Sequence, residues 1–572
     1  QTANNRVTKN TVTISGGIVH DNVYGGYNAS IAYDSGAVTG NTVSVSGGRI
    51  EGDIFGGVTH DNQPPEPSTI TAASSGGNSI TITGGTVGGY RPDGTLRGNI
   101  YGGYANGTNL SVETGNTVTL GKDDGTYEQG TDLTNATIFG GATQRTGNTL
   151  NIYDSATAGN IRNFDVINFK AKSSHIAVGD TLLTLNDGNA TTLDWKKLHV
   201  DDIDNTNASA TEDRILTLMH SAGNINLTNY STTGTRGRIH SADYEADITT
   251  DGNSATTRNI YLKGYRFRNN TANYAGGSAT DAWGGRSIIG NKVQNNTLML
   301  TGGSASLAAR GGMVENTALD SHGNPKTAGD AEGNKLILNT GAQAGSAYGA
   351  EVRTKAGSAT DNTATLNAGT VNGNLYGAAL TAAGATGNAT KNKVVLKGGT
   401  VAGDVYGGHI ADVAATGHIT DSEVKITGGH IGGTIYGGRN EGAGNATGAT
   451  ITITGGTMGD VYGGFTNGSG MTTGNTVNLG TATDAVAAGT TVGTIYGGNK
   501  NVVTGNTLNV GSRGASATDV RNFENVNFDV AHNVGHGDTM LTLTNGANTS
   551  IDWTKMKLRN LDTITTSPVT GR

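Results

Sequence analysis

The chain has 572 residues, 93 of them glycine and 6 proline, and it contains no cysteine. The lack of cysteine excludes disulfides, thiolate metal sites and cysteine nucleophiles. Charged residues make up only 15% of the chain and the formal net charge is −8. Because phosphate contacts require clustered Lys and Arg, and no basic block occurs, the composition argues against nucleic-acid binding.

One short pattern recurs along the chain: an aliphatic residue, an aromatic residue and two glycines, the second of which is alanine in two copies. Successive copies within two groups lie about 26 to 46 residues apart, mostly near 30, a period typical of solenoids, propellers and arrays. The ten aromatic residues are Tyr24, Phe55, Tyr101, Phe139, Tyr348, Tyr376, Tyr406, Tyr436, Tyr462 and Tyr496.

A strand pattern precedes each aromatic motif, as in NTVTISGG at 10–17 and ATITITGG at 449–456. Val12 and Ile14 alternate with threonines, and such a period of two predicts a half-buried strand. Helical periodicity is not evident anywhere. The sequence therefore predicts an all-β protein, an elongated parallel β-helix or β-solenoid with about one coil per repeat and with inserted loops.

Positions around the motif indicate how a coil is built. The aliphatic residue before each aromatic is expected to fill the interior. The residue before that always has a short side chain with an oxygen, which suits a turn that stacks on itself between coils. We expect the ten aromatics to form a structural ladder by stacking on one another. The alternative is an exposed row of rings that binds sugars.

A longer duplication lies above this repeat. Residues 147–169 match 505–528, and residues 179–200 match 537–558, so that Trp195 corresponds to Trp553. AWGGR at 282–286 resembles a degenerate copy of the motif. The first half continues through ILTLMHSAGNINLTNY, where the second stops, so we expect a longer parent chain. The predicted segments are a first repeat array at 1–146, a β-rich closing segment at 147–290, a second array at 291–504 and a truncated second closing segment at 505–572.

These coils, rich in Gly, Thr and Asn and free of cysteine, with repeated NTVTI…GG strands, resemble the passenger domains of bacterial type V autotransporters, especially adhesin-like ones. The resemblance covers nearly the whole chain and brings no catalytic motif. It implies a right-handed β-helix that is exported to the cell surface through a C-terminal outer-membrane barrel. No barrel-like stretch occurs in this sequence, so membrane attachment would depend on a barrel that is not part of it.

Catalytic motifs are weak throughout. GSASL at 303–307 and GSAYG at 345–349 come close to a nucleophile elbow, but neither has a strand-turn-helix context. Asp53, Asp404 and Asp460 share one position with Asn and Thr, which favours a turn ladder over a carboxylate cleft. We expect no catalytic residue and therefore not an enzyme.

Two clusters could hold a metal ion, but the sequence favours neither. Asp201, Asp202 and Asp204 supply oxygen ligands of the kind that calcium prefers, although a solvated loop explains them as well. His532 and His536 are four residues apart and lack a third ligand. We expect no metal and no cofactor.

The sequence thus favours a non-enzymatic extracellular structural or adhesive protein. It would be a cell-surface stalk or a self-associating fibre of a Gram-negative-type bacterium, with head-to-tail copies, or a surface glycan or protein, as partners. The alternatives are a glycan-cleaving β-helix enzyme and a module that binds glycans through inserted loops such as 63–75 or 90–97.

Overall fold

The computed structural model describes most of the chain. The described residues are 6–29, 36–60, 74–90, 96–106, 112–122, 131–142, 146–170, 179–200, 214–231, 244–288, 290–316, 329–500, 504–530, 534–535, 537–549 and 551–560. They fall into two compact units: unit 1 extends to Gly264, and unit 2 is built chiefly from Tyr265 onward. The division lies within the predicted segment 147–290, so that segment contributes to both units.

Strands dominate both units, as the period-two patterns predict. The helices in the described part of the chain are four 3-10 turns: η1 Trp195–Lys197, η2 Asp251–Asn253, η3 Gly546–Asn548 and η4 Trp553–Lys555. None of these is long and apolar enough to cross a membrane. The predicted all-β solenoid is confirmed.

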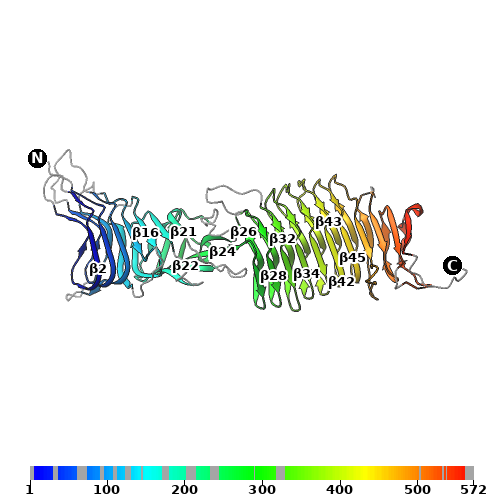
Figure 1. The fold of residues 1–572 in the computed structure, drawn as a ribbon, viewed down its shortest axis with the longest axis horizontal. Coiled ribbons are helices and arrows are strands. Elements are labelled where there is room, and N and C mark those ends of the chain that lie inside the picture. Colours follow the sequence, from blue (N-terminus) through cyan, green and yellow to red (C-terminus); the bar gives the residue numbers. More distant parts are fainter. Residues whose placement is uncertain are drawn as a thin grey trace. The chain divides into compact units, whose positions relative to one another are not determined.

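Unit 1 contains two long sheets, and successive coils contribute one strand to each (Figure 1). The sheet that begins with the NTVTI pattern, here called the threonine sheet, consists of β2 (Thr11–Val19), β6 (Thr42–Ile50), β10 (Ser79–Val87), β14 (Thr117–Leu120), β16 (Thr149–Ile152), β18 (Val166–Phe169) and β21 (Leu198–Val200). The sheet that carries the aromatic motif, here called the aromatic sheet, contains β3 (Val23–Tyr24), β7 (Ile54–Phe55), β13 (Ile100–Asn106), β15 (Leu133–Gly141), β17 (Ala156–Arg162), β19 (Thr181–Leu185) and β22 (Arg214–Thr228). Pairing is parallel and in register, so that Val43 lies opposite Ile80 and Ile54 opposite Ile100.

The parallel stack of unit 1 ends in a way that the sequence did not indicate. β22 pairs in parallel with β19 and β20 (Thr191–Asp194), but it pairs antiparallel with β24 (Thr256–Arg266). An antiparallel partner reverses the chain direction, so a further coil cannot continue the same register there.

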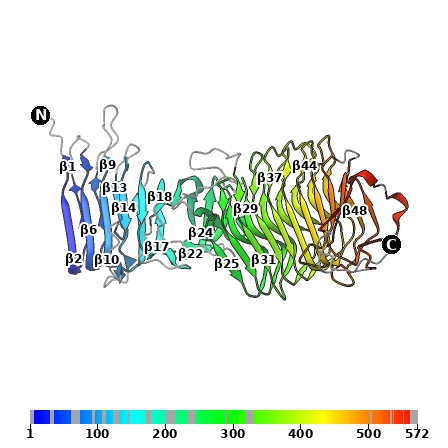
Figure 2. The same cartoon turned by 45° about the vertical axis from the view of Figure 1, so that its right-hand side comes forward.

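Unit 2 repeats the architecture (Figure 2): threonine strands pair in parallel with threonine strands of the next coil, aromatic strands with aromatic strands, and both series belong to one sheet of 22 strands. Its threonine strands are β25 (Thr271–Tyr274), β28 (Thr297–Leu300), β31 (Lys335–Leu338), β34 (Thr363–Leu366), β38 (Lys393–Leu396), β42 (Glu423–Ile431), β45 (Thr450–Thr457), β47 (Thr476–Leu479), β49 (Thr507–Val510), β52 (Asn525–Asp529) and β54 (Met556–Arg559). Its aromatic strands are β26 (Ser278–Ser287), β29 (Ser304–Val314), β32 (Gln343–Val352), β36 (Leu375–Leu380), β40 (Val405–Ile410), β43 (Ile435–Asn440), β46 (Val461–Thr466), β48 (Thr494–Gly498) and β51 (Asp519–Arg521). β35 (Thr370–Val371) and β39 (Thr400–Val401) complete it.

The interior is aliphatic, as expected. The residue before each aromatic is buried in all ten copies, from Val23 with 6% of its surface exposed to Val405 with 0%. Unit 2 has a second, smaller apolar core that the repeat pattern did not reveal. It is formed where the aromatic strands end, by residues such as Leu380 and Ile410, against short strands such as β37 (Ala389–Thr390) and β41 (Ile419–Thr420).

A column of asparagines precedes the threonine strands and is buried except at its first member in each unit, Asn10 and Asn270; the sequence pattern marks these residues only as strand starts. In most steps the side-chain oxygen of one asparagine accepts hydrogen bonds from the backbone and side chain of its counterpart in the preceding coil. Asn296 accepts from the backbone N–H of Asn270, whose side chain donates instead to the Gly284 carbonyl. Asn362 Oδ1 lies 3.0 Å from the backbone nitrogen of Asn334 and 2.9 Å from its Nδ2. The column contains Asn10, Asn41, Asn78, Asn116 and Asn148 in unit 1 and Asn270, Asn296, Asn334, Asn362, Asn392, Asn475 and Asn506 in unit 2.

The double glycine of the motif is required by close approach. A Cβ on Gly102 would lie 2.7 Å from the carbonyl oxygen of Gly140 in the next coil, and a Cβ on Gly57 would lie 2.7 Å from Asn78 Nδ2. These glycines do not have a positive φ. The first glycine therefore lets neighbouring coils approach, and the second makes room for the asparagine column.

We expect Asn362→Ala to lower the free energy of unfolding by about 1–3 kcal/mol, because it leaves the buried backbone N–H of Asn334 without its acceptor. Asn372→Ala is the matched control: Asn372 is exposed in the same coil, and its loss should change little. Denaturant unfolding of both variants measures the difference, and equal midpoints would contradict a stabilising role for the column.

Candidate functional site

The aromatic residues of the motif form one stack in each unit. In unit 1 the ring centroids of Tyr24, Phe55, Tyr101 and Phe139 follow one another at 5.2, 5.0 and 4.7 Å. In unit 2 six tyrosines from Tyr348 to Tyr496 are separated by 4.5, 4.8, 5.2, 5.5 and 4.3 Å. The ring planes are inclined by at most 15°, so the stacking is face to face.

Neighbouring side chains cover the flanks of these rings. His409 stacks on Tyr406 at 4.7 Å, the Arg439 guanidinium lies 4.9 Å from the centre of the Tyr436 ring, and Phe465 meets Tyr462 edge-on at 5.5 Å. Tyr406 is consequently only 4% exposed, whereas Tyr24 in the first coil is 36% exposed. Four of the ten rings, Phe55, Tyr376, Tyr406 and Tyr436, are thus buried, and five of the other six are partly buried, which limits the ring surface open to sugars.

The turn position two residues before the aromatic also forms a ladder. Asp404 Oδ1 accepts from the backbone N–H of Thr434 in the next coil at 2.7 Å, and Asn22 Oδ1 accepts from that of Asp53 at 2.8 Å. In the same way Asp460 accepts from Thr494 at 2.8 Å. The three aspartates singled out in the sequence are therefore turn residues of separate coils and do not form a carboxylate cleft.

One coil at the start of unit 2 departs from the aromatic pattern. Trp283, Arg310 and Tyr348 are register partners in consecutive coils. AWGGR is therefore a true copy of the motif, whereas the copy AARGG, in which arginine replaces the aromatic, was missed because the search required an aromatic residue. GSASL and GSAYG lie at the starts of β29 and β32 and have no helix after them.

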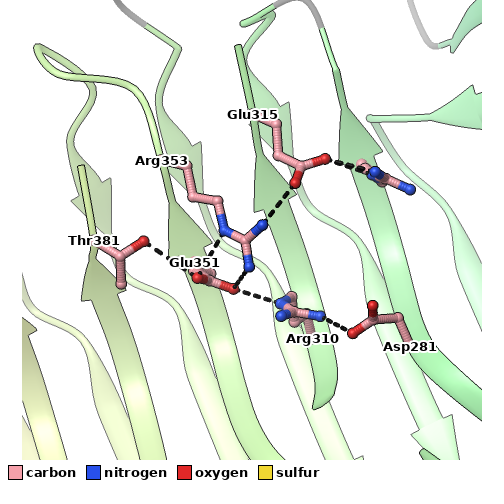
Figure 3. Close-up of polar contacts among 7 residues, drawn as sticks. Asp281, Arg310, Glu315, Glu351, Arg353 and Thr381 are labelled. Atoms are coloured by element: carbon pink, nitrogen blue, oxygen red, sulfur yellow. Dashed lines mark hydrogen bonds and ion pairs between the residues drawn. The ribbon is translucent and has the colours of Figure 1, made fainter. Parts of the chain in front are cut away.

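Arg310 belongs to a charged cluster that spans several coils (Figure 3). Its Nε and Nη1 donate to Glu351 and Asp281, each at 2.5 Å. Arg353 bridges Glu351 at 2.9 Å and Glu315 at 2.8 Å.

The outer members complete this cluster. Arg286 donates to Glu315 at 2.8 Å through its Nε, and Thr381 donates to Glu351 at 3.2 Å. The cluster has three arginines, Arg286, Arg310 and Arg353, and three carboxylates, Asp281, Glu315 and Glu351. Each carboxylate is paired with an arginine.

Burial and pairing act on the cluster in opposite directions. Burial alone would raise the pKa of the Glu351 carboxyl, but the Arg310 charge and the hydrogen bonds and charge of Arg353 hold this pKa below its usual range. Burial likewise raises the pKa of the Tyr348 hydroxyl, and the negative charge of Glu351 raises it further. The arginines therefore hold the buried Glu351 in its charged form.

The remaining candidates do not form a site in the described residues. Asp201, Asp202, Asp204, His532 and His536 lie outside those residues, as do positions 63–73 of the loop 63–75 and positions 91–95 of the loop 90–97. In the described part of the chain, no group of three or more His, Cys, Asp or Glu could hold a metal ion.

We expect Arg310→Ala to lower the free energy of unfolding by about 3–5 kcal/mol, because it deprives the buried Glu351 of a partner. Arg513→Ala is the control: Arg513 is 60% exposed, lies 3.2 Å from Asp538, and should contribute under about 1 kcal/mol. Chemical unfolding of both variants decides, and equal losses would contradict the prediction.

The lowered pKa of Glu351 predicts how its contribution to the free energy of unfolding depends on pH. Its stabilising contribution is fully present above the unfolded pKa of about 4.3 and is lost as pH falls through the lower folded pKa. The difference in free energy of unfolding between wild type and Glu351→Gln should therefore shrink only when the pH falls below about 4.3.

The tyrosine stack predicts a second pH dependence, at alkaline pH. Burial raises the pKa of the Tyr406 hydroxyl. Its hydrogen bond to the Asp404 carboxylate, at 2.8 Å, and the negative charge of Asp404 raise this pKa further. The resulting stabilisation is present below the unfolded pKa of about 10 and is lost as pH rises beyond it. The free energy of unfolding, measured by denaturant at several pH values across this range, should fall less steeply with rising pH for Tyr406→Phe than for wild type.

Tyr406→Leu provides the contrast, because it removes the ring as well as the hydroxyl. We expect it to lose about 1–3 kcal/mol near neutral pH through the ring contacts with Tyr376, His409 and Tyr436, whereas the phenylalanine variant retains them. Identical pH profiles for wild type and Tyr406→Phe would show that ionisation of this hydroxyl is not linked to unfolding.

Comparison with known proteins does not assign the chain to a family: no family model, no curated protein and no solved structure matches it.

Proposed function

We propose that this chain is a non-enzymatic structural or adhesive protein of the bacterial cell surface. In this proposal it serves as a β-solenoid stalk or a self-associating fibre, in the manner of the autotransporter passenger domains that its repeat resembles. The observation that carries the proposal is that the repeated polar and aromatic side chains bind one another between coils. Side chains that could bind or react are instead stacked on their counterparts in the next coil.

The columns support a mechanical role in particular. Successive coils are joined by the backbone ladder and, in most coils, also by the asparagine column, the turn ladder and the aromatic stack. In a solenoid each repeat contacts only its neighbours, so such interfaces supply much of the stability. A stalk or fibre requires this kind of cohesion along its length.

The glycan alternative has weaker support. A sugar-binding row would need exposed ring faces, but Tyr376, Tyr406 and Tyr436 are 7%, 4% and 7% exposed. The partners that we propose are therefore other copies of the chain, or surface proteins and glycans contacted without cleavage.

Adhesion and catalysis can be separated in one experiment. Beads coated with the full chain are incubated with bacterial and animal cells, and the soluble chain is incubated with polysaccharides that are then assayed for new reducing ends or unsaturated products. We expect beads to attach or to cluster, and no polysaccharide to be cleaved.

Val405→Asp is the matched control, because burying a carboxylate at a fully buried position should open the stack locally. Attachment or clustering should weaken in this variant. Turnover of a polysaccharide by the wild-type chain, or the absence of both attachment and clustering, would contradict the proposed function.

A further inference from the structure

The duplicated closing segments of the two units have the same local structure. In unit 1, β17 pairs in parallel with β19, with Ala158 opposite Leu185. In unit 2, β50 (Ala515–Ala517) pairs in parallel with β53 (Leu541–Leu543), with Ala517 opposite Leu543. A 3-10 turn follows in both units, η1 in unit 1 and η4 in unit 2, and each is capped by an aspartate that accepts from a backbone N–H at 2.9 Å.

The same positions nevertheless differ greatly in exposure. Trp195 is 3% exposed, whereas its counterpart Trp553 is 81% exposed. Val200 is 2% exposed, whereas its counterpart Leu558 is 62% exposed. The inner aliphatic positions are fully buried in unit 1 and only partly buried in unit 2. The partly buried residues are Met540, Leu541, Leu543, Ile551 and Met556.

Strand β22 accounts for the burial in unit 1. It pairs in parallel with β19, with Leu183 opposite Met219, and then with β20, with Leu193 opposite Leu227. Leu218, Met219 and Ile225 of this strand are 0% exposed. Just beyond the strand, the Tyr230 ring lies 5.0 Å from that of Trp195. In unit 1, β22 and the residues just after it thus supply both the backbone partner of β19 and β20 and the apolar cover of Trp195.

Within the described residues of unit 2, β53 pairs only with β50, so the edge that corresponds to the β22 side of β19 has no strand on it. We propose that this face, formed by β53, Ile551, Trp553 and Leu558, binds an extended polypeptide strand with the sequence pattern of β22. The bound strand pairs in parallel with Leu541–Leu543 and then with the residues before Asp552, in the register seen in unit 1.

The geometry of unit 1 also defines what this strand must contain. β22 has two apolar stretches, LTLM and INL, separated by HSAGN at 220–224. A Cβ on Gly223 would lie 2.5 Å from the carbonyl oxygens of Gly188 and Asn189, so a glycine is needed where the strand crosses this turn. The exposed first strand of unit 1, β2, has the sequence TVTISGGIV, in which only three residues separate the apolar stretches VTI and IV, whereas five separate those of β22. It also has no aromatic residue at the position that Tyr230 occupies three residues after the second apolar stretch of β22. The surface therefore selects a β22-like strand over the free edge of a second copy.

A synthetic peptide with the sequence of residues 214–231 tests the proposal on the full chain. Two of the three tryptophans, Trp195 and Trp283, are buried at 3% and 8% exposure, so Trp553 is the one accessible to a soluble quencher. We expect the peptide to shift the tryptophan emission to shorter wavelength and to remove most of the acrylamide quenching. A peptide with L218D and L227D should do neither.

Two further measurements keep the test valid if the peptide is insoluble or if another segment covers Trp553. A chain extended at its C-terminus by a flexible linker and residues 214–231 should show the same protection of Trp553, and one extended by a scrambled segment should not. Trp553→Ala, which changes an exposed residue, should weaken peptide binding without altering thermal unfolding. The proposal is overturned if neither peptide nor extension protects Trp553, or if Trp553 becomes protected only through concentration-dependent self-association of the unmodified chain.

Discussion

The constraint on which this structure depends is the in-register, parallel pairing of each coil with the next. Adjacent parallel strands lie about 4.8 Å apart, so every side chain is placed next to its counterpart one repeat away. A position therefore works only if its side chain is compatible with a copy of itself. Aliphatic residues, aromatic rings and carboxamides meet this condition, because a carboxamide has both a donor and an acceptor and a ring can stack on a ring.

Charged side chains do not meet this condition, and this explains their low number. Like charges at adjacent positions repel. At some charged positions the neighbouring coil supplies the opposite sign, whereas Lys335 has the neutral register partners Thr297 and Thr363. Lys393 lies opposite Glu423, and their charged groups are 2.7 Å apart. Arg310 and Glu351 form an ion pair between adjacent coils, although they are not direct register partners. A polar chain with few charges is thus a consequence of stacking identical coils.

Much of the fold could be predicted from this self-stacking. The strands, the buried aliphatic position and the turn residues all recur with the repeat, so a single pattern located them. Properties that depend on the neighbouring coil could not be read in the same way. The pattern marked the asparagine before each threonine strand only as a strand start, and its position against the second glycine, as in Asn78 against Gly57, shows that it is buried. The aromatic pattern likewise concealed the Arg310 coil, because a residue unlike its neighbours breaks the repeat.

Exceptions within a column show how the packing adapts. Ser422 and Ala449 interrupt the asparagine column in unit 2, and the Ser422 hydroxyl is buried with no hydrogen-bond partner among the described residues. In the adjacent short strand Ile419 replaces the alanine of the neighbouring coils, and a Cβ on Gly408 would lie 2.9 Å from its Cγ2 and 3.0 Å from Ser422 Oγ. The larger isoleucine occupies space that the smaller serine leaves free. Function-bearing differences in such a protein should therefore be sought where one coil departs from the next without a compensating neighbour, and the uncovered Trp553 face is the clearest departure of this kind in the described residues.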